Sequence, residues 1–78
     1  MEQNKMMEIK RKSAENYKRV YDSFEIDQRV ELTTDSYQPD IEEGAEGVIV
    51  DKAFSEYGCD LRVDFLGYVT WIDAVDVR

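Results

Sequence analysis

Four carboxylates crowd one short segment of the chain and are the first residues whose spacing could do chemistry. They are Asp40, Glu42, Glu43 and Glu46. Paired carboxylates can transfer protons or hold a hard cation. A calcium loop, however, needs oxygen ligands at alternate positions, a central glycine and a glutamate at its twelfth position, and this segment lacks that spacing. We interpret it as a solvated acidic loop, with a partner-facing acidic patch and a metal or catalytic site as alternatives.

Missing residue types narrow the chemistry further. The chain contains no histidine and a single cysteine, Cys59. Without histidine, Ser-His-Asp and Cys-His catalysis are excluded, and the commonest metal ligand is lost. One cysteine can form neither an internal disulfide nor a structural zinc site. We therefore expect a protein that is not an enzyme, with no catalytic residue, no metal site and no cofactor.

A pair of glycines follows the first three of these carboxylates. Gly44 and Gly47 are three residues apart and run into Val48-Ile49-Val50. A Gly-x-x-Gly loop clamps nucleic-acid backbone in the KH module, but that module needs helices on both sides and basic residues in the middle. Here Ala45 and Glu46 fill the middle and a strand-like run follows. We interpret the pair as a bend, where glycine permits a positive φ.

Charge divides the chain into two unequal parts. Its 78 residues carry a net charge of −8. Residues 1–24 contain six basic and four acidic residues, whereas residues 25–78 contain four basic and fourteen acidic residues, which is 4 − 14 = −10. Such a surface repels phosphate backbones, so nucleic-acid binding by residues 25–78 is not expected. A basic protein partner would suit it.

Neither a membrane span nor a secretory signal is expected. No stretch approaches the roughly 18 apolar residues of a spanning helix. The chain starts MEQNKMMEIKRK, which is charged and has no apolar run after it. We therefore expect a cytoplasmic protein that does not engage a membrane.

Residues 5 to about 24 predict one amphipathic helix, within an N-terminal unit of residues 1–26. Apolar side chains recur at helical spacing near its end. They are Tyr17, Val20, Tyr21 and Phe24. Two interpretations compete for this stripe. It packs on the chain's own core, or it forms a helix interface with a partner or a second copy, so that the protein is a monomer or a homodimer.

From residue 27 the apolar period changes from helical to alternating, which predicts strands. We expect five short antiparallel strands at 29–33, 48–54, 60–65, 68–72 and 75–78, with one long loop at 35–47. Leu61, Val63 and Phe65 should face inward, Leu66-Gly67 should form a hairpin turn, and Trp71 should lie in the core. Five strands of this length cannot bury their apolar faces as a flat sheet, so we expect a small barrel.

The order of these elements resembles the Src-homology-3-like small barrel. The segment Glu43-Gly44-Ala45-Glu46-Gly47-Val48-Ile49-Val50 resembles the KOW-type approach to its second strand, and LRVDFLGYVTWI resembles the third and fourth strands. This resemblance covers residues 27–78. It implies a mainly β, α+β protein, in which a five-stranded antiparallel SH3-like barrel follows one amphipathic helix. The chain lacks the basic loops of KOW domains and the Ala-Leu-Tyr-Asp-Tyr-like run of proline-peptide binders.

The resemblance also implies where a ligand would bind, because two loops flank the ligand groove of such barrels. Here those loops carry two tyrosines and several carboxylates. The partner-binding residues expected on this basis are Tyr37, Asp40, Glu42, Glu43 and Tyr57. Exposed together, they would form an aromatic and acidic surface suited to a basic segment.

The favoured function is therefore a small acidic, non-catalytic interaction module that binds a basic protein surface or segment. One alternative is a phage-type nucleic-acid mimic that inhibits a host or defence protein, such as an anti-CRISPR protein. It would need rows of carboxylates spaced like phosphates. A second alternative is nucleic-acid binding through the basic helix alone, with the barrel facing away.

Overall fold

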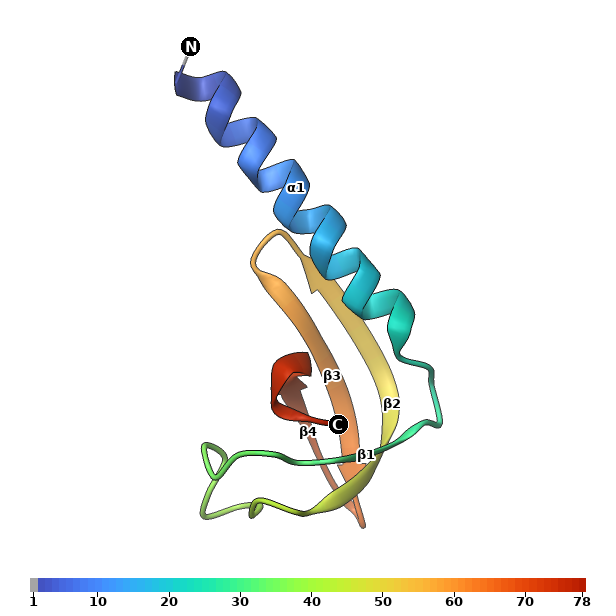
Figure 1. The fold of residues 1–78 in the computed structure, drawn as a ribbon. Helices are drawn as coiled ribbons and strands as arrows, with labels where there is room; N and C mark the ends of the chain where they lie inside the picture. Colours follow the sequence, from blue (N-terminus) through green and yellow to red (C-terminus); the bar gives the residue numbers. More distant parts are fainter. Residues whose placement is uncertain (1) are drawn as a thin grey trace.

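The structure contains one helix followed by strands, in the order that the sequence predicts. The computed structural model describes the backbone of residues 2–78 and side chains from residue 13 onward (Figure 1). Its elements are α1 (Glu2–Ser23), β1 (Arg29–Glu31), β2 (Glu46–Ser55), β3 (Gly58–Phe65), β4 (Tyr68–Asp73) and the short 3-10 helix η1 (Ala74–Asp76). The expected mainly β, α+β class is confirmed.

The strands form one antiparallel sheet in the order β1-β2-β3-β4, so each strand pairs with its neighbours in sequence. The predicted hairpin turn between β3 and β4 is confirmed. Leu66 has a φ of +57° and Gly67 a φ of +103°. Two successive positive φ values are typical of the type I′ turn, whose twist matches that of the strands it joins.

The fifth predicted strand, at 75–78, is not present as a strand. After β4 the chain turns through η1, because the Asp73 carboxylate accepts a hydrogen bond from the Val75 amide at 3.1 Å. The C-terminal residues then run beside the end of β1, where Leu32 and Val77 form an isolated β-bridge and no continuous strand. The sheet therefore has four strands, and neither the five-stranded arrangement nor the closed barrel is confirmed.

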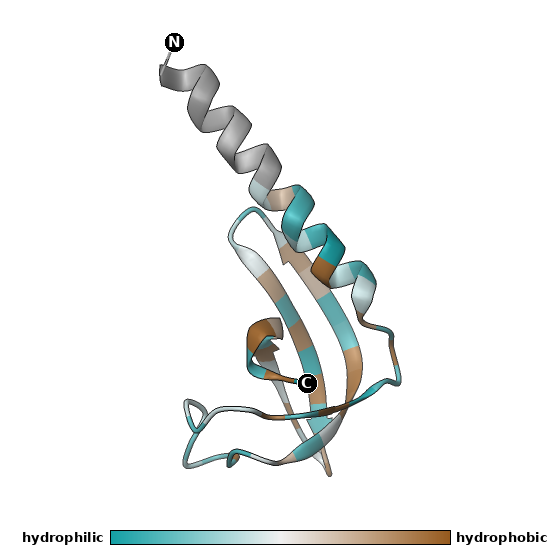
Figure 2. Cartoon of the chain, viewed as in Figure 1, coloured by the Kyte–Doolittle hydropathy of each residue, from teal (hydrophilic) through white to brown (hydrophobic). Residues whose placement is uncertain are grey.

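The core lies on the inner face of the curved sheet. Leu61, Val63 and Phe65 of β3 are buried as predicted, and polar residues alternate with them, a pattern visible along β3 in Figure 2. The expectation that Trp71 is buried is wrong, since 45% of it is exposed. The two-residue turn pairs Tyr68 with Phe65, which puts Ile72 on the inner face and Trp71 on the outer face.

The end of α1 packs against this core. Tyr17, Val20, Tyr21 and Phe24 are partly buried against the core cluster. The rings of Tyr21 and Phe54, from β2, lie 4.9 Å apart with a tilt of 56°. The helical stripe thus contacts the chain's own core, as the first of the two interpretations expected. Self-association through the helix remains a hypothesis.

A bulge in β2 decides which side chains meet the helix. The pairing of β2 with β3 shifts register between Ile49 and Asp51. Because successive strand residues point to opposite faces, one extra residue exchanges the faces of all residues after it. Lys52 and Phe54 consequently share the inner face with Leu61 and Cys59, their partners on β3.

Lys52 closes the C-terminal end of α1. Its ammonium group donates hydrogen bonds to the carbonyl oxygens of Tyr21 at 2.9 Å and Phe24 at 2.8 Å. It also lies 4.1 Å from the centre of the Tyr21 ring. The last carbonyls of a helix have no partner within the helix and carry partial negative charge, so a cation is favourable there.

The two glycines have different roles. Gly44 has a φ of +89° and its amide donates to the Leu32 carbonyl at 2.7 Å, so it forms the bend expected of glycine. Gly47 lies within β2 and is needed for close packing. A Cβ atom there would lie 2.5 Å from Cγ1 of Val63 and 2.9 Å from the carbonyl oxygen of Asp64.

Gly47→Ala should destabilise the protein by about 1–3 kcal/mol, the usual range for overpacking a core. Gly58→Ala is the matched control, because no atom lies within 4 Å of a Cβ built at that strand position. Urea denaturation of both variants measures the difference. Equal stabilities of the two variants would show that the contact at Gly47 relaxes without cost.

Lys52→Met keeps the aliphatic stem and removes the ammonium group. We expect a loss of about 1.5–3 kcal/mol, the range for hydrogen bonds made by charged groups. Arg62→Met, on the outer face, provides the control with the same charge change. If urea denaturation finds both variants equally stable, the contact with the helix end does not stabilise the fold.

Candidate protein-binding surface

Tyr37 ties the loop at 33–45 to the segment after β4. Its hydroxyl donates to Oδ2 of Asp76 at 2.9 Å and accepts a hydrogen bond from the Asp73 amide at 3.0 Å. The side chain is half-buried and packs against the core. Of the residues predicted to bind a partner, Tyr37 is therefore already engaged within the fold, and its hydroxyl has two internal partners.

The three predicted carboxylates of the same loop, Asp40, Glu42 and Glu43, are all exposed. The loop is held by Asp35, whose carboxylate accepts a hydrogen bond from the Glu43 amide at 3.2 Å. Asp40 lies close to Tyr68 on β4. Partial burial of the Tyr68 ring and the neighbouring Asp40 carboxylate together raise the pKa of that phenol.

Tyr57 lies far from those carboxylates. It is 80% exposed in the turn between β2 and β3, whereas the loop at 33–45 precedes the opposite end of β2. The ten residues of β2 separate the two places, which at about 3.3 Å per residue is on the order of 30 Å. Figure 1 shows the turn beside α1 and the loop at the other end of the sheet. The structure thus does not gather the five predicted residues into one surface.

Three exposed apolar residues on the outer face of the sheet were not predicted. They are Val50 at the bulge of β2 and Val69 and Trp71 on β4, which are 42%, 41% and 45% exposed, and β3 lies between the two strands. Trp71 pairs with Arg62, and Val69 pairs with Asp64. The sequence did contain a signal for the exposure of Val69 and Trp71. A two-residue turn after the inward Phe65 requires Tyr68 to face inward, and therefore Val69 and Trp71 to face outward.

Charged side chains share the outer face with these three residues. The outer-face positions of β2, β3 and β4 include Asp51, Asp60, Asp64 and Asp73, and Arg62 stands between Asp51 and Trp71. Asp60 and Asp73 stand directly opposite each other on neighbouring strands. We call Val50, Val69 and Trp71 with these four aspartates the acidic outer face. Its combination of an indole ring and carboxylates can bind cations, by stacking and by charge.

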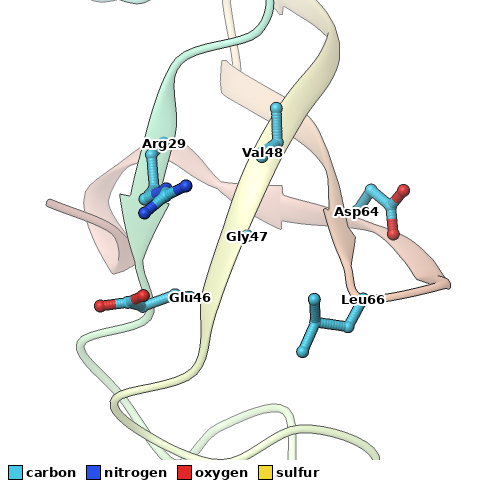
Figure 3. Close-up of a pocket in the computed structure, with 6 residues that line it drawn as sticks. All are labelled: Arg29, Glu46, Gly47, Val48, Asp64 and Leu66. Carbon is cyan, nitrogen blue, oxygen red and sulfur yellow. The ribbon is translucent and has the colours of Figure 1, made fainter.

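An open hollow of about 210 Å³ adjoins this face near the turn between β3 and β4. Figure 3 shows Arg29 and Glu46 on one side of β2 and Asp64 and Leu66 on the other. Charges of both signs line it, and Leu66 is fully exposed. It is smaller than the 300–1,000 Å³ typical of small-molecule sites, so a single side chain fits it better.

The described residues contain neither a metal-ligand group nor a membrane-spanning helix. Among the side chains of residues 13–78, no three from cysteine, aspartate or glutamate form a group that could hold a metal ion. None of the described segments makes a helix with the length and apolar character needed to cross a bilayer. Burial raises the pKa of the Cys59 thiol, and the charges of Asp60 and Asp73 act in the same direction.

Stability should fall at alkaline pH. Burial raises the pKa of Tyr37 above its ordinary 10.0 and that of Cys59 above its ordinary 9.0. The fold therefore favours the protonated forms, and their contribution is present below pH 9 and lost as pH rises through the folded pKa values. Urea denaturation between neutral and strongly alkaline pH measures this loss.

Tyr37→Phe should lower the free energy of unfolding by about 0.5–1.5 kcal/mol at neutral pH. It should also make the fall of that free energy at alkaline pH shallower. An unchanged dependence on pH would contradict this prediction.

Comparison of this chain with known protein families, with curated proteins and with solved structures found no match. Its function therefore has to be inferred from the residues and the geometry described above. The acidic outer face is the feature that offers the most chemistry for such an inference.

Proposed function

We propose that the chain is a small, non-catalytic interaction module that binds a basic protein surface or segment. The observation that carries this proposal is the exposed Trp71 among outward carboxylates on the acidic outer face. An indole ring binds lysine and arginine through its π face, while carboxylates pair with the same charges. A basic partner would satisfy both, whereas an acidic partner or a nucleic acid would be repelled.

The negative charge of residues 25–78 is poorly compensated within the chain. Of its four basic residues, Lys52 binds the end of α1, Arg78 pairs with Glu31 at 2.9 Å, Arg62 lies between Asp51 and Trp71 on the outer face, and Arg29 lies on β1. Like charges directly opposite each other on neighbouring strands are destabilising, yet Asp60 faces Asp73. A cationic group bound between them would remove that repulsion. This cost to stability is easier to understand if the face binds a basic partner.

We further infer that residues 27–78 form a small barrel of the SH3-like, KOW-like kind. Three backbone hydrogen bonds support this. Glu31 and Arg78 exchange two, at 2.9 and 3.0 Å, and the Thr33 amide donates to the Asp76 carbonyl at 2.8 Å. They draw the C-terminal residues along β1, where the fifth strand of such a barrel would lie. Folds of this type serve many functions, so binding is argued from the surface alone.

Nucleic-acid mimicry and binding through the helix remain alternatives. Mimicry requires an unbroken row of carboxylates, and here Arg62 and Trp71 interrupt the outward aspartates. Most of the basic side chains behind the helix alternative, Lys5, Lys10, Arg11 and Lys12, lie outside the described side chains. Lys18 pairs with Asp22 at 3.4 Å. The interaction module is therefore the better-supported function.

The proposal is tested with a lysine decapeptide and a glutamate decapeptide as probes. Trp71 is the only tryptophan of the chain, so its fluorescence reports binding at the acidic outer face directly. The lysine probe should change the emission at low salt and lose the effect at high salt, since exposed charges are screened. The glutamate probe should have no effect. A lysine probe that leaves the emission unchanged and shows no binding by calorimetry would refute the function.

Two double variants with equal charge changes locate the binding surface. Asp51→Asn with Asp60→Asn removes two carboxylates from the acidic outer face, and Glu42→Gln with Glu43→Gln removes two from the loop. Two lost surface charges at up to about 1 kcal/mol each predict roughly 3- to 30-fold weaker binding of the lysine probe for the first variant. The loop variant should bind nearly as the native protein does. If the loop variant instead binds the lysine probe more weakly than the outer-face variant does, the binding site lies on the loop.

A further inference from the structure

The exposed edge of β4 has a defined hydrogen-bonding pattern. In a two-residue hairpin the residues next to the turn, here Phe65 and Tyr68, exchange hydrogen bonds, and such pairs then alternate along the ladder. Thr70 and Ile72 therefore direct their backbone groups toward β3. Those of Val69, Trp71 and Asp73 point away from the sheet. β4 is the last strand of the sheet, so these groups lie at its free edge.

One contact within the fold supports this assignment. The Asp73 amide donates to the Tyr37 hydroxyl, which belongs to the loop at 33–45 and not to β3. The outward direction of Asp73 fixes that of Val69 and Trp71, because both are an even number of residues away. Within the described residues, no backbone hydrogen bond joins Val69 or Trp71 to a segment outside the sheet.

This edge lacks the features that usually protect a free strand. The residues from Tyr68 to Ile72 are Tyr-Val-Thr-Trp-Ile, with neither a charge nor a proline. All five are residue types enriched in strands. Proteins commonly block free edges with lysine, proline or a covering segment, because unpaired backbone groups recruit another chain. Here the loop at 33–45 reaches both ends of the strand, with Tyr37 at Asp73 and Asp40 beside Tyr68, and Val69 and Trp71 between these ends remain half-exposed.

We propose that the edge of β4 binds an extended, basic segment of another protein as an added strand. This rests on the proposed function and states where and how the partner binds. Strand addition satisfies the backbone groups of Val69 and Trp71, and alternate side chains of the added strand reach the two faces of the sheet. The edge supplies backbone hydrogen bonds and the surrounding carboxylates select the charge.

Charge favours a basic segment over a second copy of this chain. Carboxylates border the edge on several sides: Asp73 lies at one end, Asp40 lies beside Tyr68 at the other, and Asp64 pairs with Val69 on the outer face. Lysine or arginine at alternate positions of an added strand would meet them. A second copy would bring the same carboxylates and a net charge of −8 against them.

Two peptides of equal charge test the proposal on the full-length protein. The first alternates lysine and threonine and is free to form a strand. The second has the same sequence with every backbone amide methylated, which removes the donors from both edges of the strand and keeps the charge. The first should bind, monitored by Trp71 fluorescence, and methylation should weaken binding about tenfold or more, since several backbone hydrogen bonds are lost.

Variants at Val69 supply a second measurement. Val69→Pro removes a donor from the free edge and leaves the ladder to β3 intact, a position at which strands tolerate proline. Val69→Thr keeps the donor and is the matched control. Circular dichroism establishes that each variant is folded. The proline variant should bind the unmethylated peptide several-fold more weakly than the threonine variant does, because one hydrogen bond to the added strand is lost.

The possible outcomes separate this inference from the proposed function. Equal binding of both peptides by the native protein overturns strand addition and leaves charge-driven binding of a basic partner intact. Absence of binding by either peptide overturns the proposed function as well. Sedimentation could also find a homodimer that Val69→Pro abolishes. If the protein then shows no preference between the peptides, the edge pairs with a second copy of the chain, and the proposal is overturned. A folded Val69→Pro protein that binds the unmethylated peptide as tightly as the Val69→Thr protein also overturns it.

Discussion

The single-residue bulge in β2 sets which side chains of that strand meet the helix and which face outward. Strand side chains alternate between two faces, so a regular β2 would direct Asp51 and Ala53 toward α1. A carboxylate would then face the partial negative charge of the helix carbonyls, which is repulsive. The extra residue presents Lys52 and Phe54 instead. One register shift thus replaces a repulsive contact with a cation, two hydrogen bonds and an aromatic contact.

The same bulge shapes the surface proposed for binding. Beyond it Asp51 joins the outer face opposite Arg62, and Val50 stays exposed beside it. The turn at Leu66 and Gly67 has a corresponding effect on β4, because its length directs Val69 and Trp71 outward. Packing of the inner face is therefore coupled to exposure of the outer face. The sheet buries its core with Ile49, Val63 and Ile72, and leaves an indole ring among carboxylates on the other side.

Two polar side chains hold segments that strands alone would not fix. Lys52 binds the end of α1, and Tyr37 binds the segment between β4 and the C-terminus. Both contacts join residues far apart in sequence, and neither involves the backbone of Val69 or Trp71 at the edge of β4. Lys52 and Arg78 are paired inside the fold, so four outer-face aspartates share the neighbouring Arg62 as a counter-ion. A basic, extended partner is the ligand that uses the open edge and the uncompensated charge together.

Features that depend on the local spacing of residues could be predicted from the sequence. The helical stripe ending at Phe24, the alternation of β3, the hairpin at Leu66, the bend at Gly44 and the division of charge could all be predicted. Tertiary structure alone decided the bulge at Val50, the role of Lys52, the distance between Tyr57 and the acidic loop, and the single bridge at Val77. Each depends on which distant segment packs against the residue, and alternation along one strand carries no information about its partner. The exposure of Trp71 lies between these cases. It follows from the local two-residue turn, but only if one already knows that Phe65 faces the core, because Tyr68 then faces the same side and Trp71 the opposite one.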